Sequence, residues 1–408
     1  MRGTAFPSDG IPLYNPFAEG FADDPYPQYA RLRNSAPVYR HPVGFWVLSR
    51  YDDVSALLRS GTSVDLRNSG SAPPRRTGEE AKKMPLTSGF SMIDRDPPDH
   101  TRLRRLVQKA FTPRAVNALA GRITELVDQM LDEIAAAGRA DLVTALAFPL
   151  PFTVIAEMLG TPPTDHARVR ELSGTIVRAL EPVFDPETLQ AIEAADRELA
   201  AIVAEMIAWK RDNPSDDLLT ALIRAEEDGD VLSDDELVAQ VLLLYLAGHE
   251  TTMSLVSGGA LALLRYPDQL AALREDPGLM PNAIEELLRY HSPLQTSRRV
   301  TLKPTVFGDT EIPAGAVVIA GLASANRDEH HWGPDASVLR LDRDGARGHV
   351  SFGAGTHHCL GASLGRLEAS ITFERMVKRF PKLALDGDVV WNGRINVRGP
   401  AKLPIRVH

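Results

Sequence analysis

The segment from Leu237 to Leu264, in which most residues are apolar, most constrains how this chain can fold. The four residues Ser233 to Glu236 just before it match a capping box, in which Ser and Glu side chains bind the first backbone N–H groups of a helix. With Pro267 as its end, a helix of about 32 residues would span roughly 48 Å and cross the whole molecule. Because Glu250 beside His249 would be costly at the centre of a bilayer, we interpret the segment as a buried helix of a large protein.

Helical periodicity dominates the chain from Pro97 to about Tyr290. Apolar residues recur every three or four positions in three further segments, 116–137, 168–180 and 189–209. Asn213-Pro214 and Asp228-Gly229 interrupt this pattern, as Pro and Gly pairs do at turns. A last helix is expected at about 360–380.

Short strands and loops are predicted on either side of this helical body. We expect a short helix at 26–33, a hairpin that joins 38–40 to 45–48, and a long, lid-like loop from Ser60 to Ser88. After Val300, Gly and Pro turns separate short strands. The fold class is therefore mainly α with a minor β part, in a single domain with a mixed part at about 1–90, a helical body at about 97–290 and a β-containing part at about 291–408.

Composition excludes several classes of protein. The 408 residues are 44% hydrophobic, which is typical of a globular protein rather than a disordered one. The formal net charge of −9 makes a general nucleic-acid binder a poor interpretation. A single cysteine, Cys359, excludes an intramolecular disulfide and favours a reducing, cytoplasmic location. The first sixteen residues lack the apolar core of a secretory signal, so we expect no membrane anchor.

The single cysteine lies in a glycine-rich loop, Phe352-Gly353-Ala354-Gly355-Thr356-His357-His358-Cys359-Leu360-Gly361. The loop leads into the last predicted helix, whose N-terminus would stabilise a thiolate. Glycines also let a backbone approach something flat and bulky. Two alternatives remain at this point: a lone buried cysteine, and a zinc site that would need His349, His357 and His358 together.

This loop resembles the haem-binding loop of cytochromes P450, Phe-Gly-x-Gly-x-His-x-Cys-x-Gly, at every fixed position including Gly361. The resemblance implies the cytochrome P450 fold, with haem b between the long helix and the loop. It makes Cys359 the axial thiolate ligand of the iron, which would favour O–O cleavage. It also implies that His357 contacts a haem propionate and that Phe352 packs near the sulfur.

The middle of the long helix, Ala247 to Thr252, combines a glycine with adjacent polar residues. A glycine inside a helix costs about 1 kcal/mol relative to alanine, and buried Glu and Thr need partners, water or a task. These residues could simply tie the helix to a neighbour. They also resemble the oxygen-binding segment of cytochromes P450. In that reading Ala247 and Gly248 leave room for O₂, Thr251 bonds the bound oxygen species and Glu250 relays protons.

Other charged residues gain meaning from the same resemblance. Glu286 and Arg289, three apart on one helix face, match the Glu-x-x-Arg pair that anchors the core beneath the haem loop. His100 and Arg104, four apart, match the helix that holds the propionates, although alone they would read as a solvated basic helix start. Arg299, with Arg298 adjacent, is similar to another propionate-binding arginine.

One departure from the family pattern concerns the stretch before Leu341. The family usually has an Arg and a Phe there, and this chain has Val338 and Leu339. The usual third partner of the Glu286–Arg289 pair is therefore not identified by sequence.

The resemblance implies a monooxygenase that inserts one atom of O₂ into an apolar substrate, such as a terpenoid, steroid or macrolide of secondary metabolism. Electrons would come from NAD(P)H through ferredoxin reductase and a ferredoxin. The chain is expected to be a monomer that binds neither nucleic acid nor membrane. The pocket walls would be Phe90, Met92, Leu243, Leu244, Leu294, Thr296 and Ile395. A basic patch for an acidic iron–sulfur donor would comprise Arg102, Arg105, Lys109, Arg114 and Arg366, unless these are scattered solvated side chains.

Three alternatives stay open at this stage. A peroxide-driven haem-thiolate peroxygenase shares the fold but typically lacks the acid–threonine pair that Glu250 and Thr251 form. A haem sensor or electron carrier would not need a proton relay. A helical scaffold without haem would leave the loop around Cys359 unexplained.

Overall fold

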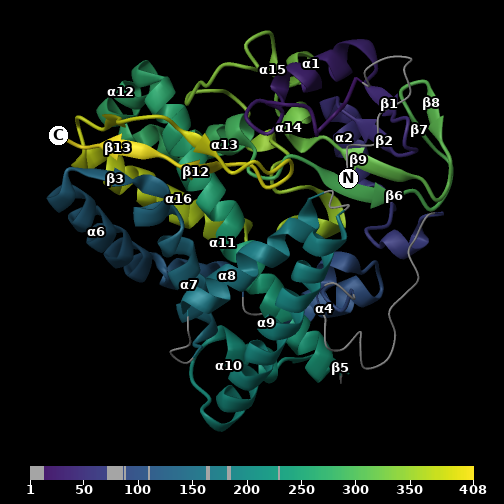
Figure 1. The fold of residues 1–408 in the computed structure, drawn as a ribbon, viewed down its shortest axis with the longest axis horizontal. Coiled ribbons are helices and arrows are strands. Elements are labelled where there is room, and N and C mark those ends of the chain that lie inside the picture. The colour runs from purple at the N-terminus through teal and green to yellow at the C-terminus, as the bar shows by residue number, and fades with distance from the viewer. Residues whose placement is uncertain are drawn as a thin grey trace.

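The computed structural model describes residues 13–70, 86, 89–108, 111–161, 166–181, 185–227 and 230–408. The helix α11 (Asp234–Arg265) crosses the centre of the molecule (Figure 1). Its N-cap is Ser233, whose side chain accepts from the Glu236 N–H while the Glu236 side chain accepts from the Ser233 N–H, which confirms the capping box. With 32 residues, α11 is about 48 Å long.

Helices surround α11 on most sides, because its residues are apolar all round rather than along one stripe. It packs against α7 (Pro149–Leu159), α9 (Pro186–Asp212), α13 (Met280–His291) and α16 (Ala362–Arg379). One buried cluster joins the C-terminal half of α11 to α13 and α16, and a second joins its N-terminal half to α7 and α9. These two clusters form most of the core.

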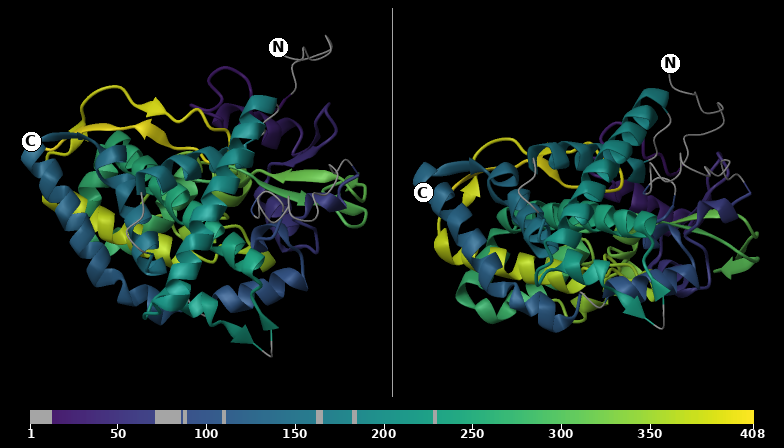
Figure 2. Two further views of the ribbon diagram at one scale, coloured as in Figure 1. Left: turned by 60° about the horizontal axis from the view of Figure 1, so that its bottom comes forward. Right: turned by 90° about the horizontal axis from the view of Figure 1, so that it is seen from below.

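The remaining helices complete this body. They are α4 (Asp99–Gln108), α5 (Pro113–Ala118), α6 (Ala120–Ala137), α8 (His166–Ile176), α10 (Leu218–Ile223) and α12 (Pro267–Glu275). The helix predicted at 116–137 is thus two helices that meet at Leu119. Figure 2 shows α6 along the outside of the molecule, next to α16, with which it packs. The helical body also contains short strands that periodicity did not predict, β3 (Arg139–Asp141), β4 (Glu226–Glu227) and β5 (Asp230–Val231).

The N-terminal part and the chain after α13 share one sheet. Its order is β1 (Val38–Arg40), β2 (Trp46–Leu48), β9 (Val317–Ala320) and β6 (Ser297–Val300). β1 and β2 form the predicted hairpin, β2 pairs with β9 in parallel, and β9 pairs with β6 antiparallel. Its buried side chains pack on α2 (Tyr51–Arg59), while α1 (Tyr26–Ser35) and α14 (Leu322–Ala325) lie nearby.

Smaller strand pairs bring distant parts of the chain together. β13 (Pro404–Arg406) lies between β10 (Ala384–Leu385) and β3, far from the larger sheet in Figure 1. β11 (Val390–Trp391) pairs with β12 (Pro400–Lys402), and β7 (Thr305–Phe307) pairs with β8 (Thr310–Ile312). The prediction of a mainly α fold with a minor β part is confirmed.

Two expectations concern segments that the model describes only in part. Of the loop predicted at 60–88, residues 71–85, 87 and 88 lie outside the described residues, and its start contains a short 3-10 helix at Leu66–Asn68. Among the helices that are described, none combines the length and apolar character needed to cross a bilayer.

Candidate active site

Cys359 lies in the loop before α16, three residues ahead of its first residue. The Cys359 N–H donates to the Phe352 carbonyl (2.9 Å), which closes the loop. The residue is exposed, yet it lies deep among protein atoms. Burial raises the pKa of its thiol, against the Gly361 backbone N–H and the charges of Arg104 and Arg366, which lower it. A thiol that is surrounded by protein atoms and yet accessible to solvent faces an internal space. A metal ion bound in that space would displace the proton of the thiol.

A glycine sets how closely this loop approaches the N-terminal part of the fold. Gly355 has a φ of +69°, and a Cβ atom there would lie 2.5 Å from the carbonyl oxygen of Leu58 at the end of α2. Only glycine adopts this conformation without strain and leaves room for the contact. The glycine-rich sequence is therefore required by packing as well as by loop shape.

Four basic side chains from three parts of the chain converge beside the loop: His100 and Arg104 of α4, Arg299 of β6, and His357. The rings of His100 and His357 are 4.0 Å apart between centroids. Burial, together with the charges of the other three groups, lowers the pKa of His357 to about 3. Burial also lowers the pKa of Arg299 to about 10, although Asp96 opposes this shift. We call these four residues the basic quartet.

The Asp96 charge acts on His100 and Arg299, but no carboxylate in the described part of the chain forms an ion pair with the arginines of the basic quartet. Arg104 donates to the His358 carbonyl (2.7 Å), and Arg299 to the Ser297 hydroxyl (2.7 Å). The Nδ1 atom of His100 is buried and has no hydrogen-bond partner among the described residues. A dianionic group would satisfy all of these donors. Of the two adjacent arginines, Arg299 belongs to the quartet, while Arg298 faces Asp94.

Together, these features fit a haem with its two propionates. The accessible thiol of Cys359 suits an iron ligand. Leu360, the next residue, packs against the buried cluster that contains the N-terminal half of α11. The basic quartet suits the two carboxylates of the propionates. The zinc alternative is not supported, because the described residues contain no group of three His, Cys, Asp or Glu able to hold a metal. His349 instead pairs with Glu285 (3.0 Å).

In the middle of α11, Ala247 is exposed, although Leu246 before it is buried and Gly248 after it is half-buried. The Thr251 hydroxyl, one turn later, donates to the Ala247 carbonyl (3.0 Å). Gly248, which is half-buried, also has a packing role, because a Cβ atom there would lie 3.3 Å from Ile155 of α7. Its lack of a side chain therefore lets α7 and α11 approach closely.

Glu250 is buried and pairs with an arginine that sequence reasoning missed. Its Oε2 lies 2.6 Å from Nη1 of Arg394, and its Oε1 lies 3.6 Å from Nε2 of His249. Burial raises the pKa of Glu250, but His249 and Arg394 outweigh it, so the pKa is below its usual range. Nδ1 of His249 must carry a hydrogen, because it lies 2.6 Å from the Tyr245 carbonyl oxygen, which only accepts.

A second buried acid, Glu368 of α16, was also missed. Its carboxyl group bonds Thr252, while its Oε2 atom has no hydrogen-bond partner within the described structure. Burial raises its pKa to about 8, and the Thr252 hydrogen bond only partly offsets this. One feature of the sequence could have indicated that Glu368 is buried. Its neighbours three and four positions earlier on the helix, Gly365 and Leu364, are small or apolar.

The Glu286–Arg289 pair is fully buried, with Arg289 Nε 2.6 Å from Glu286 Oε2. The partner that the sequence did not identify is Arg343, whose Nε lies 3.1 Å from Glu286 Oε1. Val338, where the family usually has Arg, contributes its carbonyl oxygen, which accepts from both arginines. One carboxylate therefore holds two buried guanidinium groups, and side chains at 338 and 339 are not needed for this.

The residues expected to line a substrate pocket fall into two groups. Phe90 and Met92 lie against α11, because Gln240 bonds the backbone of both, and Met92 belongs to the same buried cluster as Leu243 and Leu244. The others meet at the turn between β11 and β12. Leu294 pairs with Val397, the Thr296 N–H and hydroxyl both donate to Asn396 (2.9 Å each), and Ile395 is adjacent.

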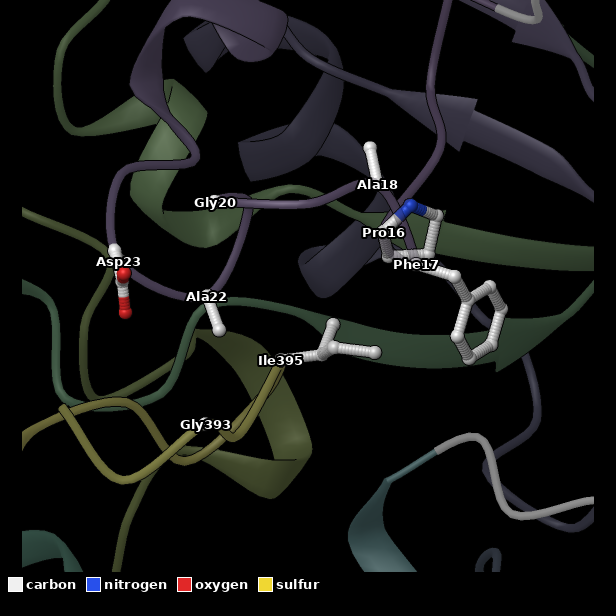
Figure 3. A pocket seen from close by; sticks show the side chains of 8 residues that line it. All are labelled: Pro16, Phe17, Ala18, Gly20, Ala22, Asp23, Gly393 and Ile395. Carbon is white, nitrogen blue, oxygen red and sulfur yellow. The ribbon is translucent and has the colours of Figure 1, made fainter.

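A cavity of about 250 Å³ lies on the outer side of that turn. The loop from Pro16 to Asp23 and the turn residues Gly393 and Ile395 line it, and Ile395 extends toward Phe17 (Figure 3). Ile395 thus lines a cavity near the surface.

The predicted basic patch is partly neutralised. Arg102 pairs with Glu236, and Arg366 pairs with Glu285 (2.8 Å) and also lies over the Phe352 ring. Arg105 and Arg114 are exposed, and Lys109 lies outside the described residues. A surface hollow of about 630 Å³ at the start of α4 includes Arg102 and Arg105.

Comparison with known proteins identifies the family of this chain. The family model described as "Cytochrome P450" matches residues 174–277 and 278–392. Cytochrome P450 107B1 of Saccharopolyspora erythraea is 42% identical over 407 residues, which cover 97% of this chain and 98% of the relative. The 6-deoxyerythronolide B hydroxylase of the same organism is 38% identical over 409 residues, 96% of this chain and 98% of the relative.

Solved structures have the same fold. The cytochrome P450 PksS of the bacillaene polyketide synthase of Bacillus subtilis 168 superimposes with a TM-score of 0.87 and 33% identity, covering 97% of this chain and 99% of that one. The family match, the relatives and the fold lead to one conclusion: this chain belongs to the cytochrome P450 family of monooxygenases.

Proposed function

We propose that this protein binds haem b through Cys359 and inserts one atom of O₂ into an apolar natural product, as a hydroxylation or an epoxidation. The observation that carries the proposal is the juxtaposition of an accessible, surrounded thiol with the basic quartet, whose arginines form no ion pair with a carboxylate among the described residues. Neither group alone would require haem. Together they match a metal-centred ring that carries carboxylates at one edge.

Each residue has a role that follows from its contacts. Haem iron, when bound, supplies the binding and reductive activation of O₂. Cys359 would ligate it as a thiolate, with the Gly361 N–H turned toward the sulfur. The basic quartet would hold the propionates. Phe352, beneath the Arg366 guanidinium, would shield the sulfur side from water.

Two acids on opposite helices would deliver protons. Glu368 retains its proton at neutral pH and bonds Thr252, so it can hold a proton at its carboxyl group next to α11. Glu250 is ionised beside Arg394 and can accept a proton from solvent at Oε2 when that ion pair opens. Thr251, beside the exposed Ala247, would pass protons on through its hydroxyl.

The substrate is proposed to be a terpenoid, steroid, macrolide or similar product of secondary metabolism. The walls assigned to the pocket are apolar or uncharged, which suits a ligand of this kind. One relative is named as a hydroxylase of 6-deoxyerythronolide B, and PksS as part of a polyketide synthase. A polyketide is therefore the first class of substrate to screen.

The electron donor is proposed to be a cytoplasmic ferredoxin, reduced by NAD(P)H through a reductase. Arg105 and Arg114 are the members of the basic patch that are exposed in the described structure. An acidic iron–sulfur protein would be attracted to them. Raising the ionic strength should then slow reduction of the haem.

The first test is the absorbance spectrum of the purified, reduced protein with and without carbon monoxide. The wild-type complex should show the red-shifted band of thiolate-ligated haem, and Cys359→Ala should lose it. Absence of haem, or a histidine-like spectrum, would refute the proposal. Turnover with O₂ and a ferredoxin system, compared with hydrogen peroxide alone, then separates a monooxygenase from a peroxygenase.

A further inference from the structure

The turn between β11 and β12 receives a carboxylate from a distant part of the chain. The Glu181 carboxylate accepts from three successive backbone N–H groups, those of Ile395 (2.7 Å), Asn396 (3.0 Å) and Val397 (3.1 Å). Glu181 directly follows the short helix Val177–Leu180 that extends α8. Its negative charge is thus bound by backbone amides, in an arrangement that suits an anion.

A second contact joins the same two segments. The Asn396 side-chain amide donates to the Leu180 carbonyl (3.3 Å), and no ion pair joins Glu181 to a cation among the described residues. Hydrogen bonds to a charged group contribute about 1.5–3 kcal/mol each when they are well formed. The conformation of the turn at 395–397 therefore depends on where Glu181 is held.

The residue before these amides is Arg394, the ion-pair partner of Glu250. Its Nη1 lies 2.6 Å from Glu250 Oε2, and its side chain is 21% exposed against 6% for Glu250. Arg394 therefore connects the solvent side of the turn to the buried acid. Among the described residues, the other charged or titratable group that faces Glu250 is His249, on α11 itself.

We propose that Arg394 is a positioning residue for Glu250, and that Glu181 sets the position of Arg394 by binding the three amides that follow it. The inference rests on the proposed function, since it concerns the acid that is proposed to relay protons. While Glu181 holds the turn, Arg394 keeps the Glu250 carboxylate in its ion pair. Without the Glu181 carboxylate the turn would be less constrained, and Arg394 would hold Glu250 less firmly in its ion pair.

Amide hydrogen exchange tests the first half of the proposal on the haem-loaded protein without turnover. Glu181→Ala should speed exchange at 395–397 by about tenfold, because charge-assisted hydrogen bonds are lost. The matched control is Glu187→Ala, an exposed glutamate in the first turn of α9. Unchanged exchange in Glu181→Ala, or equal acceleration in both variants, would overturn the anchoring role.

An infrared titration of the Glu250 carboxyl group tests the second half, with Glu250→Gln to identify its band. Arg394→Gln should raise the midpoint of protonation by about one pH unit or more, because the nearby positive charge is gone. Arg394→Lys should restore part of the shift. Glu181→Ala should raise the midpoint in the parent protein but not in the Arg394→Gln background, since both act through one residue.

The outcomes separate this proposal from the proposed function. If the midpoint of Glu250 protonation does not move in Arg394→Gln, the positioning role of Arg394 is refuted. If the midpoint moves in Arg394→Gln but not in Glu181→Ala, the coupling to Glu181 is refuted. Both results are independent of which substrate the protein oxidises. Loss of thiolate-ligated haem from the spectrum would refute the proposed function instead. If Arg394→Gln fails to fold, Arg394→Lys and Glu181→Ala still decide, because each must move the midpoint.

Discussion

Glu250 on α11 and Glu368 on α16 are two acids buried to nearly the same degree, with 4% and 1% of their surface exposed. Their ionisation is nevertheless opposite. Arg394 and His249 lower the pKa of Glu250 despite its burial, whereas Glu368 has only the Thr252 hydroxyl and its pKa is raised to about 8. Burial alone therefore does not decide the charge of an acid in this core; its partner does.

The contrast gives the two acids different uses. A carboxylate that stays ionised beside an arginine can accept a proton from solvent, whereas an acid that stays neutral can hold one close to the place where it is needed. Glu286 adds a third case, a buried carboxylate between two arginines with no access to solvent. Its role is structural, because its charge is committed to Arg289 and Arg343.

The largest effect on stability should come from Glu286→Ala, because it leaves two buried guanidinium groups without their carboxylate partner. We expect a loss of about 3–5 kcal/mol in the free energy of unfolding, measured by urea denaturation. Glu125→Ala is the matched control, because Glu125 also pairs with an arginine three residues away, Arg122, but on the surface. That control should lose less than about 0.5 kcal/mol. Equal losses would mean that burial does not distinguish the two pairs.

Glu368→Gln should change the pH dependence of stability. The carboxyl group ionises near pH 4.5 when unfolded and near pH 8 when folded, so the wild type loses stability as the pH rises through that window. The Gln variant lacks this loss, so its free energy of unfolding should fall by about 4 kcal/mol less than that of the wild type between pH 4 and pH 8. Denaturation at pH 4 and pH 8 checks this; parallel curves for the two proteins would contradict a neutral Glu368. Product formation should fall about tenfold or more if Glu368 holds a proton for the reaction.

Glu250→Gln should change the stability in the opposite direction from Glu368→Gln, and by a smaller amount. The folded-state pKa of Glu250 lies below its unfolded value, so its stabilisation is present above about pH 4.5 and is lost as the pH falls through the folded pKa. We expect the variant to be less stable at pH 7 by about 1–2 kcal/mol, because Arg394 is partly exposed and water replaces some of the interaction. If the deficit persists unchanged at pH 3, the ion pair is not its cause.

Local patterns in the sequence predicted much of the fold and part of the site. The capping box at Ser233 and the apolar run after it predicted α11 almost to the residue, because both signals are contiguous. The spacing of His100 and Arg104 placed two members of the basic quartet on one helix face. These predictions did not depend on contacts between residues that are far apart in the sequence.

The partners of the acids were not predictable in the same way. Arg394 reaches Glu250 across 144 positions, and Arg343 reaches Glu286 across 57. Nothing near either arginine in the sequence indicates its partner. Gly248 shows the same limit, since its position on the helix did not reveal that Ile155 of α7 fills the space beside it.

The smallest expected effect concerns the Thr252 hydrogen bond to Glu368. That bond lowers the pKa of Glu368 against the larger effect of burial. Thr252→Val keeps the shape of the side chain but removes the hydroxyl, so the pKa of Glu368 should rise further, by about half a unit to one unit. An infrared titration of the buried carboxyl group, with Glu368→Gln to identify its band, measures the shift. Thr251→Val on the neighbouring position should leave that band in place, because Thr251 bonds the Ala247 carbonyl instead. A shift in Thr251→Val equal to that in Thr252→Val would mean that both hydroxyls belong to one network, and that the two acids are less separate than their partners indicate.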